Sequence, residues 1–266
     1  MLLRNGISLD QALRTVNQLA IDCGNLRSEL SGGRDPWRKY VDWAATCERQ
    51  LRGLFADPGL IEGLHTRRYW QIWVPGTHWA KLIAAEIDVQ VERLEGILAR
   101  LRSYLSLRQR PGHLAVVDTN VLLHYQRVDK VNWSDVVKDH PVRVVIPHVA
   151  LDELDDKRYL GSDKIKKRAR SAIAPLEELR EQLESRGYAE LPVGQATIEY
   201  LVDEESHVRR ENPDEEVVDR ARFLQQMTGR LVTVITADLG MRARAVARGL
   251  PVAGMPDTLK RDQDDE

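Results

Sequence analysis

The spacing of hydrophobic residues changes near residue 110 from a helical period to an alternation of strands and helices. Before that point, apolar side chains recur at the spacing of amphipathic helices. The pattern predicts helices at residues 9–31, 36–54 and about 78–106. Their expected N-terminal signals are a cap at Ser8, a cap at Asp35 followed by Pro36, and a cap at Thr77. Residues 1–107 are therefore predicted to form an all-helical domain, whose role the pattern does not indicate.

From residue 113 onward, short apolar runs alternate with helical patterns. The predicted strands are residues 114–117, 142–146, 197–202, 231–236 and 250–252, and the predicted helices are residues 119–126, 148–157, 163–186, 214–228 and 238–248. Continuous apolar strands separated by helices are typical of a parallel sheet that is covered on both faces. We therefore expect an α/β domain at residues 113–256, joined by a linker at 108–112 and followed by a polar tail at 257–266.

Two features of the helical region each allow two interpretations. An aromatic stretch with two adjacent arginines, Arg67 and Arg68, contains Tyr69, Trp70, Trp73 and Trp79. It could be a base-stacking surface, but the general tendency of tryptophan to be buried favours aromatic residues in the core between helices. The apolar stripe of the third helix could pack against the first two helices, or against a second copy or another protein.

The formal charge of −2 conceals an uneven distribution. Residues 1–110 carry 16 of the 39 basic residues and 12 of the 41 acidic ones, so the remainder holds 23 basic and 29 acidic residues. Neither half resembles a polybasic tail, so any surface that binds nucleic acid must be local. The densest basic segment runs from residue 164 to residue 170.

Cysteine content and hydropathy predict a cytoplasmic protein. Cys23 and Cys47 are the two cysteines of the chain, which is too few for a disulfide scaffold, and they are expected to be reduced core thiols. No apolar stretch approaches the roughly 18–20 residues that a membrane span requires. The N-terminus lacks the apolar segment of a signal peptide.

Four acidic residues stand where predicted strands end or helices begin. Asp118 directly follows the strand 114–117, and Asp238 follows the strand 231–236 after one alanine. Glu153 lies in the helix after the strand 142–146, and Asp214 lies at the start of another helix. Each acid alone could be an N-cap or a solvated side chain. Because functional groups collect at the carboxyl edge of a parallel sheet, however, these carboxylates are expected to meet there. Anions that share one edge repel each other, which favours a bridging cation.

Four motifs in order carry a resemblance to a known family: Val-Val-Asp-Thr-Asn-Val-Leu-Leu at 116–123, Ile-Pro-His-Val-Ala-Leu-Asp-Glu-Leu-Asp at 146–155, Asn-Pro-Asp-Glu-Glu-Val-Val at 212–218, and Val-Ile-Thr-Ala-Asp-Leu-Gly-Met-Arg-Ala-Arg-Ala at 234–245. The region 113–256 resembles the PIN domain, a metal-dependent ribonuclease fold. The long basic insertion between the second and third motifs is similar to that of the larger PIN domains, such as those fused to PhoH-type ATPases.

The resemblance implies that Asp118, Glu153, Asp214 and Asp238 bind metal and act in catalysis, with Asn120 and Thr236 as polar supports. Asp219 could act beside Asp214 or in its place. Oxygen ligands without a converging set of histidine and cysteine favour Mg²⁺ or Mn²⁺ over zinc. The implied reaction is hydrolysis of RNA phosphodiester bonds by an endonuclease. Candidates for binding single-stranded RNA are Lys164, Lys166, Lys167, Arg168, Arg170, Arg242 and Arg244.

Three other functions are compatible with the sequence. A non-catalytic RNA-binding or scaffold protein could keep the same fold, but the complete set of four acids argues against it. A toxin of a toxin–antitoxin pair would not need the additional N-terminal hundred residues. A DNA flap nuclease would be expected to carry a helix-hairpin-helix element, and the sequence after the acids shows no such element.

Overall fold

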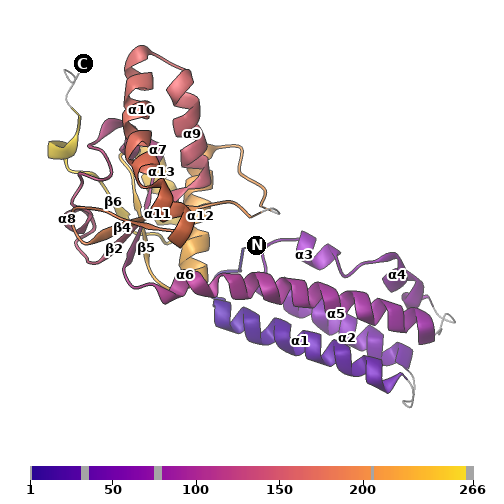
Figure 1. Ribbon diagram of the computed structural model, residues 1–266. Helices are drawn as coiled ribbons and strands as arrows, with labels where there is room; N and C mark the ends of the chain where they lie inside the picture. Colours follow the sequence, from indigo (N-terminus) through magenta and orange to yellow (C-terminus); the bar gives the residue numbers. More distant parts are fainter. Residues whose placement is uncertain (1, 31–35, 75–79, 205–206, 262–266) are drawn as a thin grey trace. The chain divides into compact units, whose positions relative to one another are not determined.

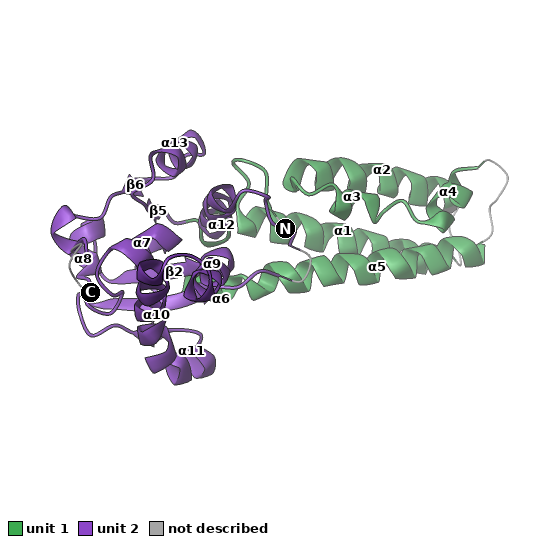
Figure 2. Ribbon diagram, turned by 90° about the horizontal axis from the view of Figure 1, so that it is seen from above, with its two compact units in different colours: residues 1–109, 226–229 green, residues 110–225, 230–266 purple. Residues whose placement is uncertain are grey.

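The computed structural model describes residues 2–30, 36–74, 80–204 and 207–261. The chain divides into two compact units (Figure 2). Unit 1 comprises residues 1–109 and 226–229, and unit 2 comprises residues 110–225 and 230–266. Among the described residues, no helix combines the length and the apolarity needed to cross a membrane.

Unit 1 is helical, as predicted (Figure 1). Its elements are α1 (Leu9–Glu29), α2 (Pro36–Leu54), α3 (Gly59–Glu62), α4 (Arg67–Trp73), α5 (Ala80–Ser103) and α6 (Leu105–Gln109). The hydroxyl of Ser8 caps α1 and accepts a hydrogen bond from the Gln11 backbone N–H at 3.1 Å. The helix predicted at 78–106 is wrong in extent, because α5 ends at Ser103 and a separate short helix follows. Asp35, Thr77 and Trp79 lie outside the described residues.

The core of unit 1 uses the apolar stripe of α5. Leu94, Ile97, Leu98 and Leu101 are buried, and α5 packs along α1 and also contacts α2 and α4. The stripe is therefore occupied within unit 1, which removes the argument for a second copy on this face. Cys23 and Cys47 are also buried and unpaired, as expected for reduced core thiols. Burial raises the pKa of both thiols, that of Cys47 to about 12.

Unit 2 contains a six-stranded sheet in the order β3-β4-β2-β1-β5-β6. The strands are β1 (His113–Val117), β2 (Val142–Pro147), β3 (Ala189–Glu190), β4 (Ala196–Leu201), β5 (Val232–Ile235) and β6 (Val252–Ala253). All neighbouring pairs are parallel except β3 and β4, which confirms the predicted parallel sheet. The two-residue strand β3 was not predicted, since so short a run has no recognisable hydrophobic period.

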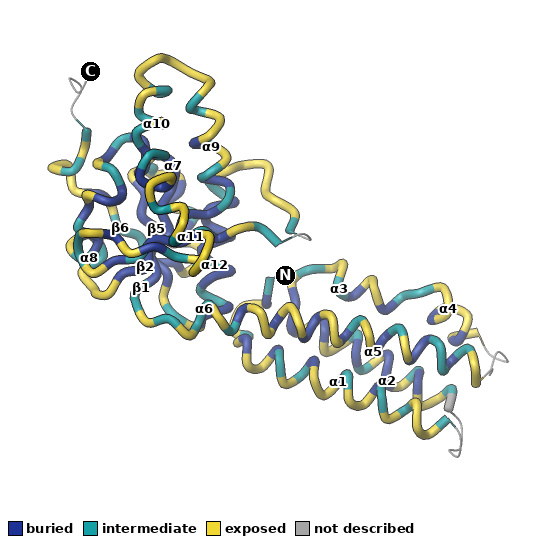
Figure 3. Tube along the Cα trace, in the orientation of Figure 1, coloured by how far each residue is buried: buried dark blue, intermediate teal, exposed yellow. Residues whose placement is uncertain are grey.

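Helices connect the strands and cover the sheet, whose central strands are buried (Figure 3). These helices are α7 (Thr119–His124), α8 (Trp133–Val137), α9 (His148–Tyr159), α10 (Asp163–Glu178), α11 (Arg180–Arg186), α12 (Pro213–Thr228) and α13 (Leu239–Ala247). The single helix predicted at 163–186 is wrong. Leu179, with φ −93° and ψ 2°, leaves the helical backbone conformation and separates α10 from α11.

The predicted polar tail begins later than residue 257. Residues Asp257–Leu259 form a 3₁₀ helix, and Lys260 pairs with Tyr125 in a β-bridge. The Gln126 N–H donates to the Leu259 carbonyl at 2.8 Å, and the Arg261 N–H donates to the His124 carbonyl at 3.0 Å. The chain up to residue 261 is therefore attached to the end of α7.

Candidate metal centre

Strand register brings Asp118 beside Thr236. Val117 of β1 pairs with Ile235 of β5, so the next residue on each strand, Asp118 and Thr236, lies at the same carboxyl edge. Asp118 is 1% exposed and is the N-cap of α7. One of its oxygens accepts a hydrogen bond from the Val121 backbone N–H at 2.7 Å, and the other accepts one from the Thr236 hydroxyl. The side chain is thus fixed by two donors on two different elements.

Asp238 is bound to the same threonine. Its backbone N–H donates to the Thr236 hydroxyl oxygen at 3.0 Å. Its Oδ1 atom caps α13 by accepting a hydrogen bond from the Met241 N–H at 2.6 Å. Capping therefore occupies one oxygen of Asp238 and one of Asp118. It does not exclude a metal ligand, since an ionised carboxylate offers about four lone-pair directions.

Glu153 reaches the same corner from α9. This helix starts directly after β2, the neighbour of β1 in the sheet. The hydroxyl of Thr119, the residue after Asp118, donates a hydrogen bond to Glu153 Oε2. Hydrophobic periodicity could not assign Glu153 to a face of its helix, and the structure places it against the first turn of α7.

Asp214 lies in the first turn of α12, where the Asn212 side chain accepts a hydrogen bond from its backbone N–H at 2.9 Å. Arg244 from α13 donates a hydrogen bond to Asp214 Oδ2 at 3.2 Å. A Cβ atom at Gly240 would stand 3.2 Å from Asp238 Oδ1 and 3.3 Å from Arg244 Nη1. Glycine at this position therefore allows the guanidinium to pass close to the start of α13, between Asp214 and Asp238.

The electrostatics of Asp118 indicate that Asp118, Asp214 and Asp238 lie close enough to repel one another. Its pKa is raised from 3.8 to about 6. Burial is the largest cause, and the negative charges of Asp214 and Asp238 raise it further. The hydrogen bonds from Thr236 and Val121 act in the opposite direction without cancelling the effect. The carboxylate is therefore held in place but is incompletely compensated by the protein.

The remaining predicted residues of the centre have different positions. Thr236 is buried, and its hydroxyl donates to Asp118 and accepts from the Asp238 backbone N–H. Asn120 is exposed in the first turn of α7, and no described residue hydrogen-bonds its side chain. Asp219 accepts hydrogen bonds from Arg210 at 2.6 Å and from Arg248 at 2.7 Å, one on each oxygen. These two arginines compensate the negative charge of Asp219, so its burial is explained by ion pairs without a metal ion.

The predicted RNA-binding residues lie mainly on α10. Lys164, Lys167 and Arg170 are exposed, and Lys166 lies 3.8 Å from Asp163. Arg168 contacts His124 of α7 at 2.9 Å. On α13, Arg242 is exposed, whereas Arg244 belongs to the acidic cluster. The predicted segment therefore includes exposed cations together with side chains that already have partners.

Sequence analysis missed part of the positive charge around the end of α7. The pKa of His124 is lowered by burial first and then by the charges of Arg168, Arg261, Lys260 and Lys157. These cations come from three separate parts of the chain. Lys157 is the cation that the sequence could have indicated, because it follows Glu153 by four residues and so lies on the same side of α9. The other two are brought close by the attachment of the chain end to α7.

A second group of possible metal ligands lies outside the predicted set. The ligand atoms of Asp203, His207 and Glu216 all lie within 4.8 Å of one another, and no other three histidine, cysteine, aspartate or glutamate residues in the described part meet this criterion. The four predicted acids are thus more widely spaced. Sequence analysis found no converging histidine, because three and eight residues separate the members of this group and no repeated spacing marks them.

The charges of the second group are compensated by the protein itself. Arg209 donates a hydrogen bond to Asp203, and Arg220 lies 3.5 Å from its other oxygen. The buried Glu216 contacts His207 at 2.6 Å and accepts a hydrogen bond from the Arg210 backbone N–H at 2.8 Å. These contacts connect the segment after β4 to α12. They account for the cluster as a polar network without a cation, despite its closer spacing.

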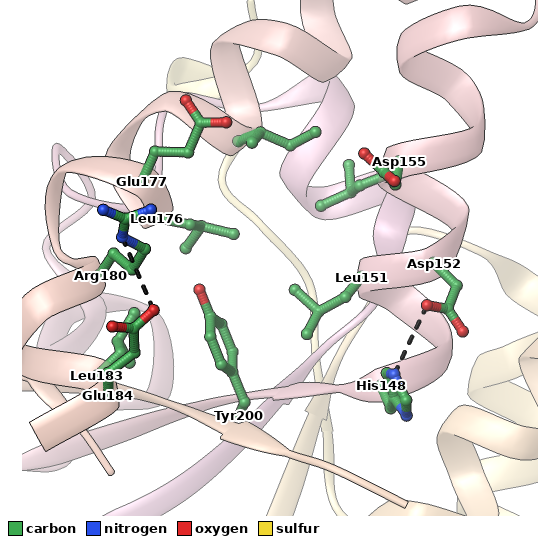
Figure 4. A pocket seen from close by; sticks show the side chains of 12 residues that line it. His148, Leu151, Asp152, Asp155, Leu176, Glu177, Arg180, Leu183, Glu184 and Tyr200 are labelled. Atoms are coloured by element: carbon green, nitrogen blue, oxygen red, sulfur yellow. Dashed lines mark ion pairs between the residues drawn. The ribbon is translucent and has the colours of Figure 1, made fainter. Parts of the chain in front are cut away.

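A pocket of about 470 Å³ lies beside α9 (Figure 4), and none of the four predicted acids is among its lining residues. Tyr200 projects into it, and its walls include Leu151, Leu176 and Leu183. At the rim, His148 faces Asp152 at 3.7 Å and Arg180 faces Glu184 at 3.7 Å. Its walls also carry four acids, Asp152, Asp155, Glu177 and Glu184, but each is exposed and ion-paired with an arginine. These carboxylates are already compensated, so the pocket is a weaker candidate nuclease site than the acidic cluster.

Comparison with known proteins decides the family. The model of the PIN domain family matches residues 115–255, more than half of the chain, and this range includes all four acids. The chain belongs to the PIN domain family. Unit 2 therefore has a nuclease-type fold, in agreement with the motifs and the parallel sheet. No curated protein matches the sequence.

A solved structure described as a domain of a functionally unknown protein from Methanocaldococcus jannaschii DSM 2661 also matches. It is 15% identical, and the match covers 58% of this chain and 97% of that chain with a TM-score of 0.36. A similarity at this level carries no argument about function. The assignment to the PIN family rests on the family match.

Proposed function

We propose that this PIN-domain protein is a metal-dependent ribonuclease that cleaves RNA internally at the cluster Asp118, Glu153, Asp214 and Asp238. The observation that carries the proposal is the buried Asp118, whose pKa is raised by burial and by two neighbouring acids. Burying an ionised carboxylate beside two other acids costs stability, and a bound cation would offset that cost. Arg244, which contacts Asp214, compensates only part of the cluster's charge.

The donor set fits Mg²⁺ or Mn²⁺. All four side chains offer carboxylate oxygens, which hard divalent cations prefer. Their spacing, wider than that of the Asp203 group, suits Mg²⁺, because this ion keeps several of its own waters and takes few protein ligands. When bound, such cations supply Lewis-acid polarisation of a phosphodiester and of an attacking water.

The surrounding residues keep the acids in position. Thr236 orients Asp118, and Thr119 orients Glu153, each through its hydroxyl. Asp118 and Asp238 are further fixed because they cap α7 and α13. Arg244 lies within hydrogen-bond distance of Asp214, where it can shift to a substrate phosphate once cations compensate the acids.

Cations beyond the acids fit a single RNA strand. Lys157, Arg168, Lys260 and Arg261 surround His124 at the far end of α7, and Lys167 and Arg170 are exposed on α10. A strand that follows α7 would meet positive charge after leaving the acids. Asn120 and Leu239 beside the acids are exposed, so a chain without a free end could cross the site. This accessibility supports the internal mode of cleavage.

The test uses purified protein with linear and circular single-stranded RNAs in Mn²⁺, with an EDTA control. We expect cleavage of both RNAs, and its loss in Asp118→Asn by at least about a hundredfold. Circular dichroism verifies that the variant is folded. Equal cleavage by Asp118→Asn would overturn the proposal, and cleavage of the linear RNA alone would overturn the internal mode. Binding of RNA without cleavage by the folded wild-type protein would instead support the non-catalytic alternative.

A further inference from the structure

Helix α4 of unit 1 presents two tryptophans to solvent. Trp70 is 58% exposed and Trp73 is 38% exposed, although Tyr69 and Ile72 of the same helix are buried. The interpretation of this stretch as core aromatics is therefore wrong for Trp70 and Trp73 and right for Tyr69. Exposed rings of this size are uncommon unless they bind something, because their burial is worth more than that of most side chains.

The exposed rings belong to a compact aromatic group. The ring centroids of Tyr69 and Trp70 are 5.1 Å apart, those of Tyr69 and Trp73 are 5.8 Å apart, and those of His65 and Trp70 are 5.4 Å apart. With Ala45, Glu48, Arg49 and Arg52 of α2, the three rings of α4 line a cavity of about 500 Å³. This volume lies in the range of small-ligand sites, roughly 300–1,000 Å³.

Positive charge surrounds these rings. Arg49 of α2 and Arg67 and Arg68 of α4 are exposed, and none of them forms an ion pair with a described residue. Arg67 precedes Trp70 by three residues, so the cation and the ring are neighbours on one side of α4. Among the described residues of the lining, Glu48 is the acidic one, and it is paired with Arg52 at 2.8 Å. The site therefore keeps unpaired guanidinium groups beside accessible rings.

We infer that the site defined by Arg49, Arg67, Trp70 and Trp73 binds the bases and backbone of single-stranded RNA. Aromatic faces stack on unpaired bases of any sequence, and guanidinium groups bind the phosphates between them. A protein segment would not require several unpaired arginines around the rings, whereas a polyanionic strand does. The choice of RNA rests on the proposed function, since the same strand would be the substrate of the PIN domain. Unit 1 then contributes RNA affinity independently of catalysis.

The test separates binding from cleavage. Binding of a fluorescein-labelled 20-nucleotide oligo(U) is followed by anisotropy in EDTA, with the full-length Asp118→Asn protein as the parent. Trp70→Ala/Trp73→Ala should raise the Kd at least tenfold. Trp70→Phe keeps an aromatic face at this position, so its Kd should lie between that of the parent and that of the double alanine variant. Arg49→Glu/Arg67→Glu should also weaken binding and reduce its dependence on salt. The two sets of variants alter different side chains, so the test does not depend on the folding of either one.

Matched controls come from other exposed positions. Tyr159→Ala removes an aromatic side chain that is 62% exposed in unit 2, and Arg102→Ala removes an exposed arginine of α5. Neither should change the Kd more than about twofold.

An unchanged Kd in both the tryptophan and the arginine variants, or no binding by the parent, would overturn the inference. So would a parent dimer that the tryptophan variant converts to a monomer in size-exclusion chromatography, because the rings would then be a protein contact.

The two proposals fail separately. If the wild-type protein cleaves RNA in Mn²⁺ while the tryptophan and arginine variants bind as tightly as the parent, the RNA site on unit 1 is wrong and the nuclease proposal stands. If the wild-type protein does not cleave but the same variants lose affinity, the RNA site stands and the nuclease proposal is wrong.

Discussion

Two clusters of acids in unit 2 resemble each other in composition and differ in how their charge is compensated. Asp203 and Glu216, with His207, lie within 4.8 Å of one another, and Arg209, Arg220 and the Arg210 backbone N–H lie beside their carboxylates, although Asp203 Oδ1 accepts no hydrogen bond from the described residues. Asp118, Glu153, Asp214 and Asp238 are more widely spaced, and among the described residues Arg244 forms an ion pair with one of them, Asp214. Burial and the neighbouring acids raise the pKa of Asp118 to about 6.

The difference indicates that residual charge identifies a cation site better than close spacing does. An ion entering between Asp203 and Glu216 would be repelled by Arg209 and Arg220, which lie beside Asp203. An ion at Asp118 would relieve repulsion between carboxylates and replace a costly desolvated charge with a coordinated one. The following predictions compare the two clusters, from the largest expected effect to the smallest.

The largest effect is on cleavage. Asp118→Asn should reduce RNA cleavage in Mn²⁺ by at least about a hundredfold, because it removes the most buried candidate ligand. His207→Gln should retain activity within about threefold, since an amide can still donate a hydrogen bond to Glu216. Initial rates on one labelled RNA check both variants. Comparable losses in the two variants would mean that the clusters do not differ in function.

Thermal stability should respond to divalent cations through the first cluster. Mn²⁺ at about one hundred times its Kd should stabilise the native state by about 2.7 kcal/mol, which corresponds to roughly 5–10 °C in Tm at this chain length. Differential scanning fluorimetry should show this increase for the wild-type protein and for His207→Gln, but not for Asp118→Asn. A shift that disappears in His207→Gln instead would assign the cation to the second cluster.

Without cations, stability should depend on the ionisation of Asp118. Its pKa is raised on folding from 3.8 to about 6, so the native state binds the proton more tightly than the unfolded state does. The wild-type protein therefore loses stability relative to Asp118→Asn as the pH rises from about 4 to about 6. The loss should total roughly 3 kcal/mol. Urea unfolding in EDTA at pH 4 and pH 7 measures it, and a constant difference between the two proteins would contradict the raised pKa.

The smallest effect concerns Arg244. Arg244→Gln removes the cation that contacts Asp214, so Mn²⁺ should bind about two- to fivefold more tightly at low salt, because this half-exposed ion pair is largely screened. Cleavage should nevertheless become slower if Arg244 contacts the substrate. Calorimetric titration of Mn²⁺ measures the affinity. Weaker binding in this variant would show that Arg244 supports the cation site and does not compete with it.

The sequence predicted those parts of the centre that depend on local order. Asp118 and Asp238 each follow a strand and cap a helix, and parallel strands bring such positions to one edge. Glu153 could not be placed, because its orientation depends on Thr119 of another helix. Arg244 was predicted as a ligand of RNA, but its contact with Asp214 depends on the close approach allowed by Gly240.

Long-range packing explains what else was missed. Short helices such as α4 have too few residues for a periodic signal, so the exposure of Trp70 could not be derived from the pattern. The cations around His124 come from α9, α10 and the residues after the 3₁₀ helix, which meet only in the folded chain. The Asp203 cluster likewise depends on the position of α12 beside the segment that follows β4.

Electron paramagnetic resonance of Mn²⁺ measures the proposed difference between the two clusters most directly. Free Mn²⁺ is titrated with wild-type protein, Asp118→Asn and His207→Gln, and the decrease of the free-ion signal gives the bound fraction. We predict that the wild-type protein and His207→Gln bind Mn²⁺ with similar Kd, and that Asp118→Asn loses this binding. If Asp118→Asn binds like the wild-type protein while His207→Gln does not, the cation belongs to the Asp203 cluster and the assignment of the metal centre is wrong.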